Sequence, residues 1–139
     1  MVPESADTPR QTVRVCVCDD VREFRELMRF GLEDDPALEV VGEAADGDES
    51  IAVVESLRPD VVLLDLSMPG RDGLEVIDEL VARASRTKIV VLSGFAAARM
   101  RDTVLARGAA RYLEKGTPLA EIRAAVREAA GLEPGLRSQ

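Results

Sequence analysis

Hydrophobic residues group along this chain into short runs that predict five β-strands. The runs at residues 13–18, 61–65 and 89–92 consist almost entirely of consecutive apolar side chains, many of them β-branched. Consecutive apolar residues are expected for strands that are covered on both faces of a parallel sheet. Residues 38–45 and 110–114 are the two further predicted strands.

Between the strands, apolar residues recur at the three- and four-residue spacing of amphipathic helices. The predicted helices span residues 21–34, 48–57, 73–83, 97–106 and 118–130. Four of them have clear apolar stripes. In chain order, these are Phe24, Leu27, Met28, Gly31 and Leu32 in the first helix, Ile51, Val54 and Leu57 in the second, Leu74, Ile77, Leu80 and Val81 in the third, and Ile122, Ala125 and Val126 in the last. In the last helix, Thr117 is the expected N-cap, Pro118 takes the first helical position and Gly131 ends the helix.

Strands that alternate with helices predict one α/β domain, in which right-handed crossovers place helices on both faces of a parallel sheet. We place this domain at residues 12–131, between a polar N-terminal tail (residues 1–11) and a short C-terminal tail (residues 132–139). In such sheets, ligands bind outside the carboxyl ends of the strands. The side chains that follow each strand are therefore the first candidates for a functional site.

Composition excludes several classes of function. The chain has 139 residues with 18 basic and 26 acidic side chains, and its net charge of −8 disfavours binding to nucleic acid. No apolar run approaches the roughly 18 residues of a membrane-spanning helix, and the N-terminus lacks the pattern of a secretory signal. The absence of histidine excludes the usual zinc sites. Cys16 and Cys18 are expected to be small buried hydrophobes in a reducing compartment.

Carboxylates follow two of the predicted strands. Asp19 and Asp20 come after the first strand, and Asp65 ends the third. Taken singly, such residues are commonly turn or helix-capping residues. Brought together at one edge of the sheet, they repel each other unless a cation lies between them. Because the available ligands are oxygen atoms, that cation is expected to be Mg²⁺.

Two other strand ends add groups suited to phosphoryl chemistry. Ser93 follows the fourth strand and Lys115 follows the fifth. Singly, they indicate no more than a turn residue and a solvated charge. A carboxylate beside Mg²⁺ can attack phosphorus to form an acyl phosphate, while a lysine and a hydroxyl stabilise the phosphoryl oxygens. The joint order of these residues at successive strand ends predicts phosphoryl transfer onto an aspartate.

With these residues identified, the chain resembles the receiver domain of bacterial two-component response regulators, from about residue 12 to residue 131. The resemblance rests on Val17-Cys18-Asp19-Asp20, on the stretch 59–73 with Asp65-Leu66-Ser67-Met68-Pro69-Gly70-Arg71-Asp72-Gly73, on Val91-Leu92-Ser93-Gly94, and on residues 108–115. It implies a flavodoxin-like (βα)5 fold, a doubly wound parallel sheet of five strands in the order 2-1-3-4-5.

The resemblance also implies a role for each matched residue. Asp65 is the phosphoacceptor. Asp20 and Asp65 bind Mg²⁺, with Asp19 acting largely through water and the backbone carbonyl of Ser67 as a further ligand. Lys115 pairs with the phosphoryl group.

Ser93 and Tyr112 take the switch positions of the family. Phosphorylation is expected to draw Ser93 toward the phosphoryl group, and Tyr112 then turns inward into the vacated space. A half-buried strand aromatic is the alternative interpretation of Tyr112. Gly94 leaves space beside the phosphoryl group, and Phe95 is placed to shield it. Gly116 follows the lysine where many receivers have proline, often with a cis peptide bond, so the resemblance does not imply a cis bond here and the loop is expected to have more freedom.

The resemblance implies a sensor histidine kinase or a phosphotransfer protein as phosphodonor, in the cytoplasm. The chain would then be a switch that catalyses only its own phosphorylation and dephosphorylation, or an intermediate of a phosphorelay. Residues 40–44 and 58–60 resemble receivers that usually precede a helix-turn-helix domain. We therefore expect either a stand-alone receiver or the receiver part of a DNA-binding regulator, with no contact between this domain and DNA or a membrane.

Other function classes fit the residues less well. A Mg²⁺-dependent aspartyl phosphatase typically needs a second aspartate two residues after the nucleophile, and Ser67 stands there. No glycine-rich phosphate-binding motif indicates a nucleotide-binding enzyme. An interaction module that works without phosphorylation would not need the complete acidic set.

A partner surface is predicted from the charge of residues 83–127, which hold 10 basic and 3 acidic side chains. This segment is expected to dock an acidic partner or the acidic half of a second copy in a homodimer. A solvated basic surface is the alternative, and charge reversal at Arg99, Arg107 and Arg123 distinguishes the two.

Overall fold

A computed structural model of the protein describes residues 12–94 and 99–134. Its centre is one parallel sheet in the order β2-β1-β3-β4-β5, so the predicted fold and strand order are confirmed. The strands are β1 (Val13–Cys18), β2 (Leu38–Ala44), β3 (Val61–Leu64), β4 (Lys88–Ser93) and β5 (Arg111–Glu114). The helices are α2 (Arg22–Glu33), α3 (Gly47–Leu57), α4 (Gly73–Arg83), α5 (Arg101–Ala106) and α6 (Leu119–Ala129).

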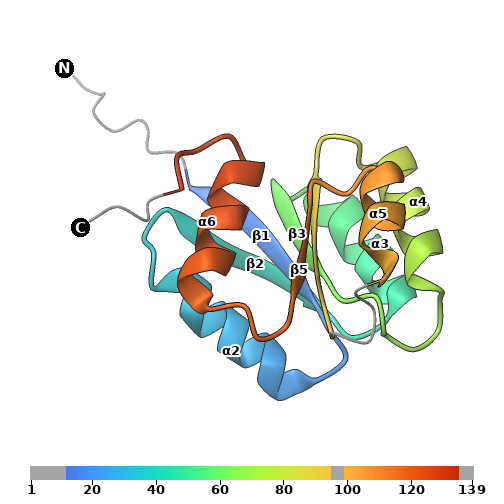
Figure 1. The fold of residues 1–139 in the computed structure, drawn as a ribbon, viewed down its shortest axis with the longest axis horizontal. Helices are drawn as coiled ribbons and strands as arrows, with labels where there is room; N and C mark the ends of the chain where they lie inside the picture. The colour runs from blue at the N-terminus through green and yellow to red at the C-terminus, as the bar shows by residue number, and fades with distance from the viewer. Residues whose placement is uncertain (1–11, 95–98, 135–139) are drawn as a thin grey trace.

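Helices cover both faces of the sheet, with α2 and α6 on one side and α3, α4 and α5 on the other (Figure 1). Alternate strand residues supply the two resulting cores. Val61 and Leu63 of β3 face the α2–α6 side, whereas Val62 and Leu64 face the other side. Both sets are almost fully buried, as the continuous apolar runs predicted.

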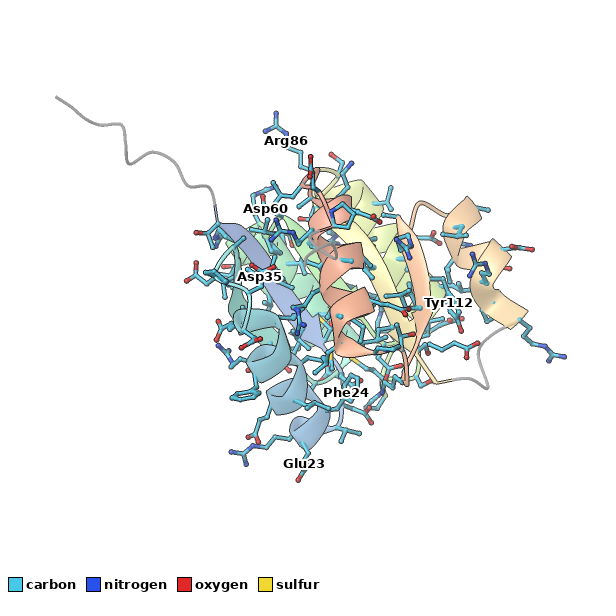
Figure 2. All side chains as sticks on the ribbon, turned by 60° about the vertical axis from the view of Figure 1, so that its left-hand side comes forward. Glu23, Phe24, Asp35, Asp60, Arg86 and Tyr112 are labelled. Carbon is cyan, nitrogen blue, oxygen red and sulfur yellow. The ribbon has the colours of Figure 1, made fainter. Side chains whose placement is uncertain are left out.

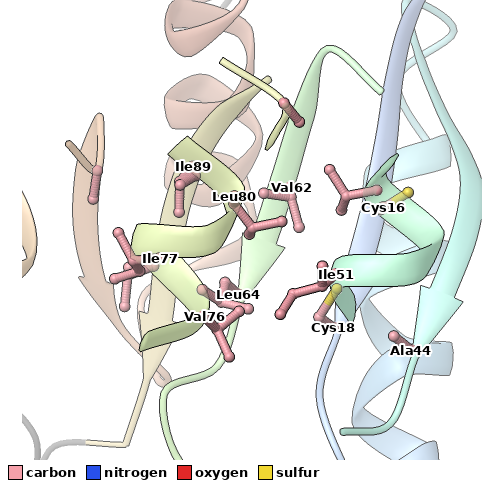
Figure 3. Packing of buried hydrophobic residues seen from close by; sticks show 14 of the residues in the cluster. Cys16, Cys18, Ala44, Ile51, Val62, Leu64, Val76, Ile77, Leu80 and Ile89 are labelled. Atoms are coloured by element: carbon pink, nitrogen blue, oxygen red, sulfur yellow. The ribbon is translucent and has the colours of Figure 1, made fainter. Parts of the chain in front are cut away.

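The two cysteines lie on β1 in the core beneath α3 and α4 (Figure 3). Cys16 and Cys18 are free, buried thiols, which confirms their expected place as small hydrophobes on one face of the strand. Burial raises the pKa of Cys16 to about 11 and that of Cys18 to about 12.

Two predicted apolar stripes are wider than the faces that become buried. Leu27 of α2 is 49% exposed and Val81 of α4 is 40% exposed. Helix α2 meets the sheet through Met28, Gly31 and Leu32, so Leu27 lies beside the contact. Helix α4 instead buries Val76, which the predicted stripe left out, because helical spacing alone does not determine the rotation of a helix on its sheet.

Helix starts follow side-chain capping at two places. Asp46 accepts a hydrogen bond from the Glu49 N–H at 2.8 Å, and Asp72 accepts one from the Leu74 N–H at 2.9 Å. The expected cap of the last helix is wrong. Its N-cap is Pro118, and the Thr117 hydroxyl instead donates to the Glu114 carbonyl, closing the turn before the helix.

The predicted helix over residues 97–106 is described from residue 99 onward, with α5 itself at Arg101–Ala106. Residues 97 and 98, and the expected shield Phe95, lie outside the described residues. Within residues 12–94 and 99–134, no helix is long and apolar enough to cross a membrane.

Candidate functional site

The three candidate carboxylates meet at the carboxyl edge of the sheet. Asp19 and Asp20 follow β1, and Asp65 follows the neighbouring strand β3. The strands are in register there, and the Asp65 N–H donates to the Cys18 carbonyl at 3.0 Å. One carboxylate oxygen from each aspartate lies within 4.8 Å of the others. Asp19 and Asp65 are 1% and 3% exposed, whereas Asp20 is exposed.

Lys115 brings a positive charge to the two buried carboxylates. Its Nζ lies 2.6 Å from Asp19 Oδ2 and 3.3 Å from Asp65 Oδ2, and it sits 4.5 Å from the centre of the Phe24 ring. The Lys115 N–H donates to the Ser93 carbonyl, which fixes the backbone beside β4. Burial alone would lower the pKa of Lys115, but the contacts with Asp19 and Asp65 raise it above its usual value.

Two serines contact the same oxygen of Asp65. The Ser93 hydroxyl, fully buried at the end of β4, lies 3.3 Å from Asp65 Oδ1. The Ser67 N–H donates to Oδ1 at 3.1 Å from the loop that follows β3. This loop also borders a cleft of about 320 Å³, lined by Leu66, Ser67, Asp72, Gly73, Leu74, Arg99 and Met100. The structure thus brings Asp65 together with Asp19, Asp20, Ser67, Ser93 and Lys115.

Tyr112 lies on β5 (Figure 2). It is 5% exposed and packs in the core on the α3–α5 side of the sheet. Its hydroxyl is buried and has no hydrogen-bond partner among the described residues. Burial, with a smaller contribution from Glu114, raises the pKa of Tyr112. Tyr112 is therefore fully inside the core rather than half-buried.

The charge and donor set of the cluster fit a hard divalent cation. Three carboxylates face one lysine, which leaves negative charge uncompensated by the contacting residues described here. Their available donors are oxygen atoms, which Mg²⁺ prefers, and the exposure of Asp20 leaves one side open to solvent. The site therefore fits Mg²⁺ by charge, ligand type and access.

Sequence reasoning missed two residues beside the cluster. Arg25 of α2 donates from Nη1 to the Asp19 carbonyl at 2.7 Å and from Nε to Glu43 Oε1 of β2 at 3.0 Å. A basic residue one helical turn after the acidic pair was the available signal. Its acidic partner is distant in sequence and could be found only in the folded sheet.

The predicted basic surface is partly neutralised in the fold. Arg107 pairs with Asp78 at 2.7 Å and Arg127 with Asp35 at 2.8 Å, both acidic residues lying outside the segment 83–127. Arg123 donates to the Gly31 carbonyl and helps to join α6 to α2. Arg99, which lines the cleft, and Arg101 are exposed. The segment is thus less uniformly basic on the surface than along the chain.

Comparisons with known proteins identify the family of this chain. The family model for the response regulator receiver domain matches residues 15–127. The transcriptional regulatory protein LiaR of Bacillus subtilis is 40% identical over 131 residues, which are 91% of this chain and 60% of LiaR. The nitrate/nitrite response regulator NarL of Escherichia coli is 36% identical over 124 residues, covering 89% of this chain and 57% of NarL.

Among solved structures, the signal receiver domain of a NarL response regulator from Mycobacterium tuberculosis superposes with a TM-score of 0.82 and 35% identity. That match covers 87% of this chain and 98% of the other.

The fold is that of an α/β receiver domain. The chain belongs to the response regulator receiver domain family of two-component systems, and it is similar to receivers of NarL-type regulators. It spans little more than half of the length of LiaR and NarL. Other relatives carry different activities, since a protein-glutamate methylesterase of Koribacter versatilis is 41% identical over 91 residues, 25% of its own length.

Proposed function

We propose that Asp65 accepts a phosphoryl group from a sensor histidine kinase or a phosphotransfer protein, in a reaction that requires Mg²⁺. One observation carries the proposal. The Asp65 carboxylate is buried at a strand end, where Lys115, Ser93 and the Ser67 N–H all contact it and Asp19 and Asp20 lie beside it.

Asp19, Asp20, Asp65 and the Ser67 carbonyl are the residues that would hold Mg²⁺, with Asp19 acting largely through water. When bound, the ion neutralises the carboxylates and the charge that develops on the phosphoryl oxygens. Lys115 adds a second positive charge from the β5 side. The Ser67 N–H and the Ser93 hydroxyl orient one Asp65 oxygen, which limits the rotation of the carboxylate.

In the proposed transfer, a carboxylate oxygen of Asp65 attacks phosphorus and forms an O–P bond. The P–N bond of the donor phosphohistidine breaks, and its electron pair leaves with the imidazole of the donor. Hydrolysis reverses the modification when water attacks the phosphorus of the acyl phosphate, and the carboxylate of Asp65 leaves. The domain thereby acts as a switch that catalyses only its own phosphorylation and dephosphorylation.

Ser93 and Tyr112 are the proposed switch residues. Ser93 is the last residue of β4, and its hydroxyl contacts Asp65. Tyr112 lies on the neighbouring strand β5, two residues before Glu114, which is the register partner of Ser93. A phosphoryl group on Asp65 offers Ser93 a stronger acceptor than the carboxylate does. This contact would stabilise the inward position of Tyr112 and so alter the surface of β5 and α5.

The output that fits the relatives best is control of transcription in the cytoplasm, through a DNA-binding domain or a separate partner. LiaR is named a transcriptional regulatory protein, and NarL is named a nitrate/nitrite response regulator. The acidic charge of this domain disfavours direct contact with DNA. Transfer onward in a phosphorelay uses the same Asp65 chemistry and is distinguished by adding a phosphotransfer protein.

The test is intact-mass spectrometry of the chain with acetyl phosphate as donor, with and without MgCl₂. We expect an adduct of ~80 Da in the presence of Mg²⁺, and its loss in Asp65→Asn. Asp60→Asn is the matched control, because Asp60 is exposed and binds the Arg14 N–H away from the cluster. A wild-type chain without an adduct, or an equal adduct on Asp65→Asn, contradicts the proposal.

A further inference from the structure

Arg25, which lies outside the acidic cluster, hydrogen-bonds the backbone between Asp19 and Asp20. Arg25 Nη1 donates to the Asp19 carbonyl at 2.7 Å, and the Arg25 side chain is 16% exposed. The Asp19 N–H donates to the Ala44 carbonyl at 3.0 Å, and Asp19 Oδ1 accepts from the Val21 N–H at 2.8 Å. Hydrogen bonds therefore hold Asp19 at its N–H, its carbonyl and its side chain.

Asp20 is held differently. It is exposed, and its carboxylate takes part in none of the side-chain hydrogen bonds or ion pairs among the residues that the structure describes. Its position depends on the backbone, above all on the peptide group that joins Asp19 to Asp20. The oxygen of that peptide group is the atom that Arg25 binds. A rotation of this peptide would move Asp20 away from Asp65.

Glu43 of β2 holds Arg25 in this position. Its Oε1 accepts from Arg25 Nε at 3.0 Å, and its Oε2 accepts from Arg29 Nη2 at 2.8 Å and Nε at 3.0 Å. Arg29 also donates to the Val40 carbonyl, so the carboxylate of Glu43 is tied to α2 and β2 together. Arg25 spans Glu43 and Asp19 with two different nitrogens, which needs the planar fork of a guanidinium.

We infer that Arg25, oriented by Glu43, is a positioning residue for metal binding, because it fixes the Asp19–Asp20 peptide and hence the place of the Asp20 carboxylate. The inference rests on the proposed Mg²⁺ site. Residues that orient metal ligands typically change metal affinity by about 10–100-fold when they are replaced. Arg25 touches none of the reacting atoms.

Charge alone predicts the opposite effect of removing Arg25 on Mg²⁺ affinity, so the two explanations can be distinguished. Arg25 is a cation near three carboxylates, and removing a cation alone would tighten Mg²⁺ binding. If Arg25 positions Asp20, its removal weakens binding in spite of the lower positive charge. The direction of the change therefore separates positioning from charge.

The experiment is calorimetric titration of MgCl₂ into the chain without phosphodonor. We expect Arg25→Ala to weaken Mg²⁺ binding about tenfold, and Glu43→Gln to weaken it by a smaller factor. Arg25→Lys keeps the charge but cannot reach both partners, so it is expected to lie near Arg25→Ala. Arg29→Ala is the matched control, because Arg29 binds the same Glu43 without contacting Asp19, and it should stay within about twofold of wild type.

A second measurement separates positioning from loss of fold. Urea unfolding without Mg²⁺ identifies which variants fold. If Arg25→Ala does not fold, the Mg²⁺ affinity of Arg25→Lys is the test of the inference. Phosphorylation of the folded variants by acetyl phosphate should recover to the wild-type rate at saturating Mg²⁺, since Arg25 acts on metal binding alone. Unchanged or tighter Mg²⁺ binding in both Arg25 variants overturns the inference. A wild-type chain that binds no Mg²⁺ instead contradicts the proposed function.

Discussion

The ammonium of Lys115 lies 2.6 Å from a carboxylate oxygen of Asp19, so the end of β5 is joined to the end of β1 across the two strands between them. This ion pair connects residues 96 positions apart in the chain. It also neutralises part of the negative charge of the carboxylates that would otherwise attract a divalent cation. Lys115 therefore stabilises the two carboxylates that it contacts and would compete with metal binding.

Replacement of Lys115 by alanine is expected to tighten Mg²⁺ binding and to slow phosphorylation of Asp65. Loss of a partly exposed pair of this kind changes the binding free energy by about 1 kcal/mol, or roughly fivefold in Kd. Lys88→Ala is the control, because Lys88 is exposed at the opposite end of β4. Calorimetric titration with MgCl₂ measures the effect, and weaker binding in Lys115→Ala would mean that the lysine does not compete with the metal.

Tyr112→Phe is expected to raise the free energy of unfolding by about 1 kcal/mol, because it removes a buried hydroxyl that has no partner among the described residues. The ring, which packs in the core, stays in place. Urea unfolding followed by circular dichroism gives the value. A clear loss of stability would show that the hydroxyl finds a partner in solution, such as an ordered water.

Gly116 has a φ of +110°, in the region that L-amino acids rarely adopt. Gly116→Ala should therefore destabilise the fold by roughly 1–2 kcal/mol, although the space around its Cβ is open. Proline, with φ near −65°, cannot take this conformation. Gly94→Ala is the matched control, since its surroundings are also open and its φ is not in that region. Equal losses in the two variants would argue against backbone strain at position 116.

The Glu43 cluster is expected to make stability depend on pH. Burial alone would raise the pKa of Glu43, but hydrogen bonds and charge from Arg29 and Arg25 outweigh it and lower the pKa. The lowered pKa stabilises the fold above the pKa of the unfolded chain, and this stability is lost as the pH falls through the folded-state pKa. The gap in unfolding free energy between wild type and Glu43→Gln should thus shrink from pH 7 to pH 4. A constant gap would contradict a titrating Glu43.

Cys16 and Cys18 should not react with a thiol reagent such as DTNB at pH 8 in the native protein. Both are buried, and their raised pKa values leave little thiolate. In urea, both should be labelled at the rate of an unfolded thiol. The time course of DTNB absorbance, with and without urea, measures this difference, and rapid labelling of the native chain would show local opening of β1.

The hydrophobic pattern predicted all five strands, and most clearly β1, β3 and β4, because a strand buried on both faces needs a nearly uninterrupted apolar run. Val61 to Leu64 is such a run, and the structure buries every residue in it. The acidic and polar residues at the strand ends were predictable for a related reason. Parallel strands end at the same edge, so residues that directly follow them converge whatever their distance in sequence.

Only the tertiary structure determined which helix residues are buried and which charged side chains pair, because both depend on how the elements are oriented against one another. Periodicity could not exclude Leu27 or include Val76, since the rotation of each helix depends on the surface against which it packs. The neutralisation of Arg107 and Arg127 depends on acidic partners from α4 and from the turn after α2. The hydrogen bond from Arg25 to the Asp19 carbonyl depends on the packing of α2 against β2. Glu43 of β2 orients Arg25 of α2, and the two residues lie 18 positions apart in the chain. The sequence thus determined which residues gather at the site, and only the folded chain determined which of them hold the others in position.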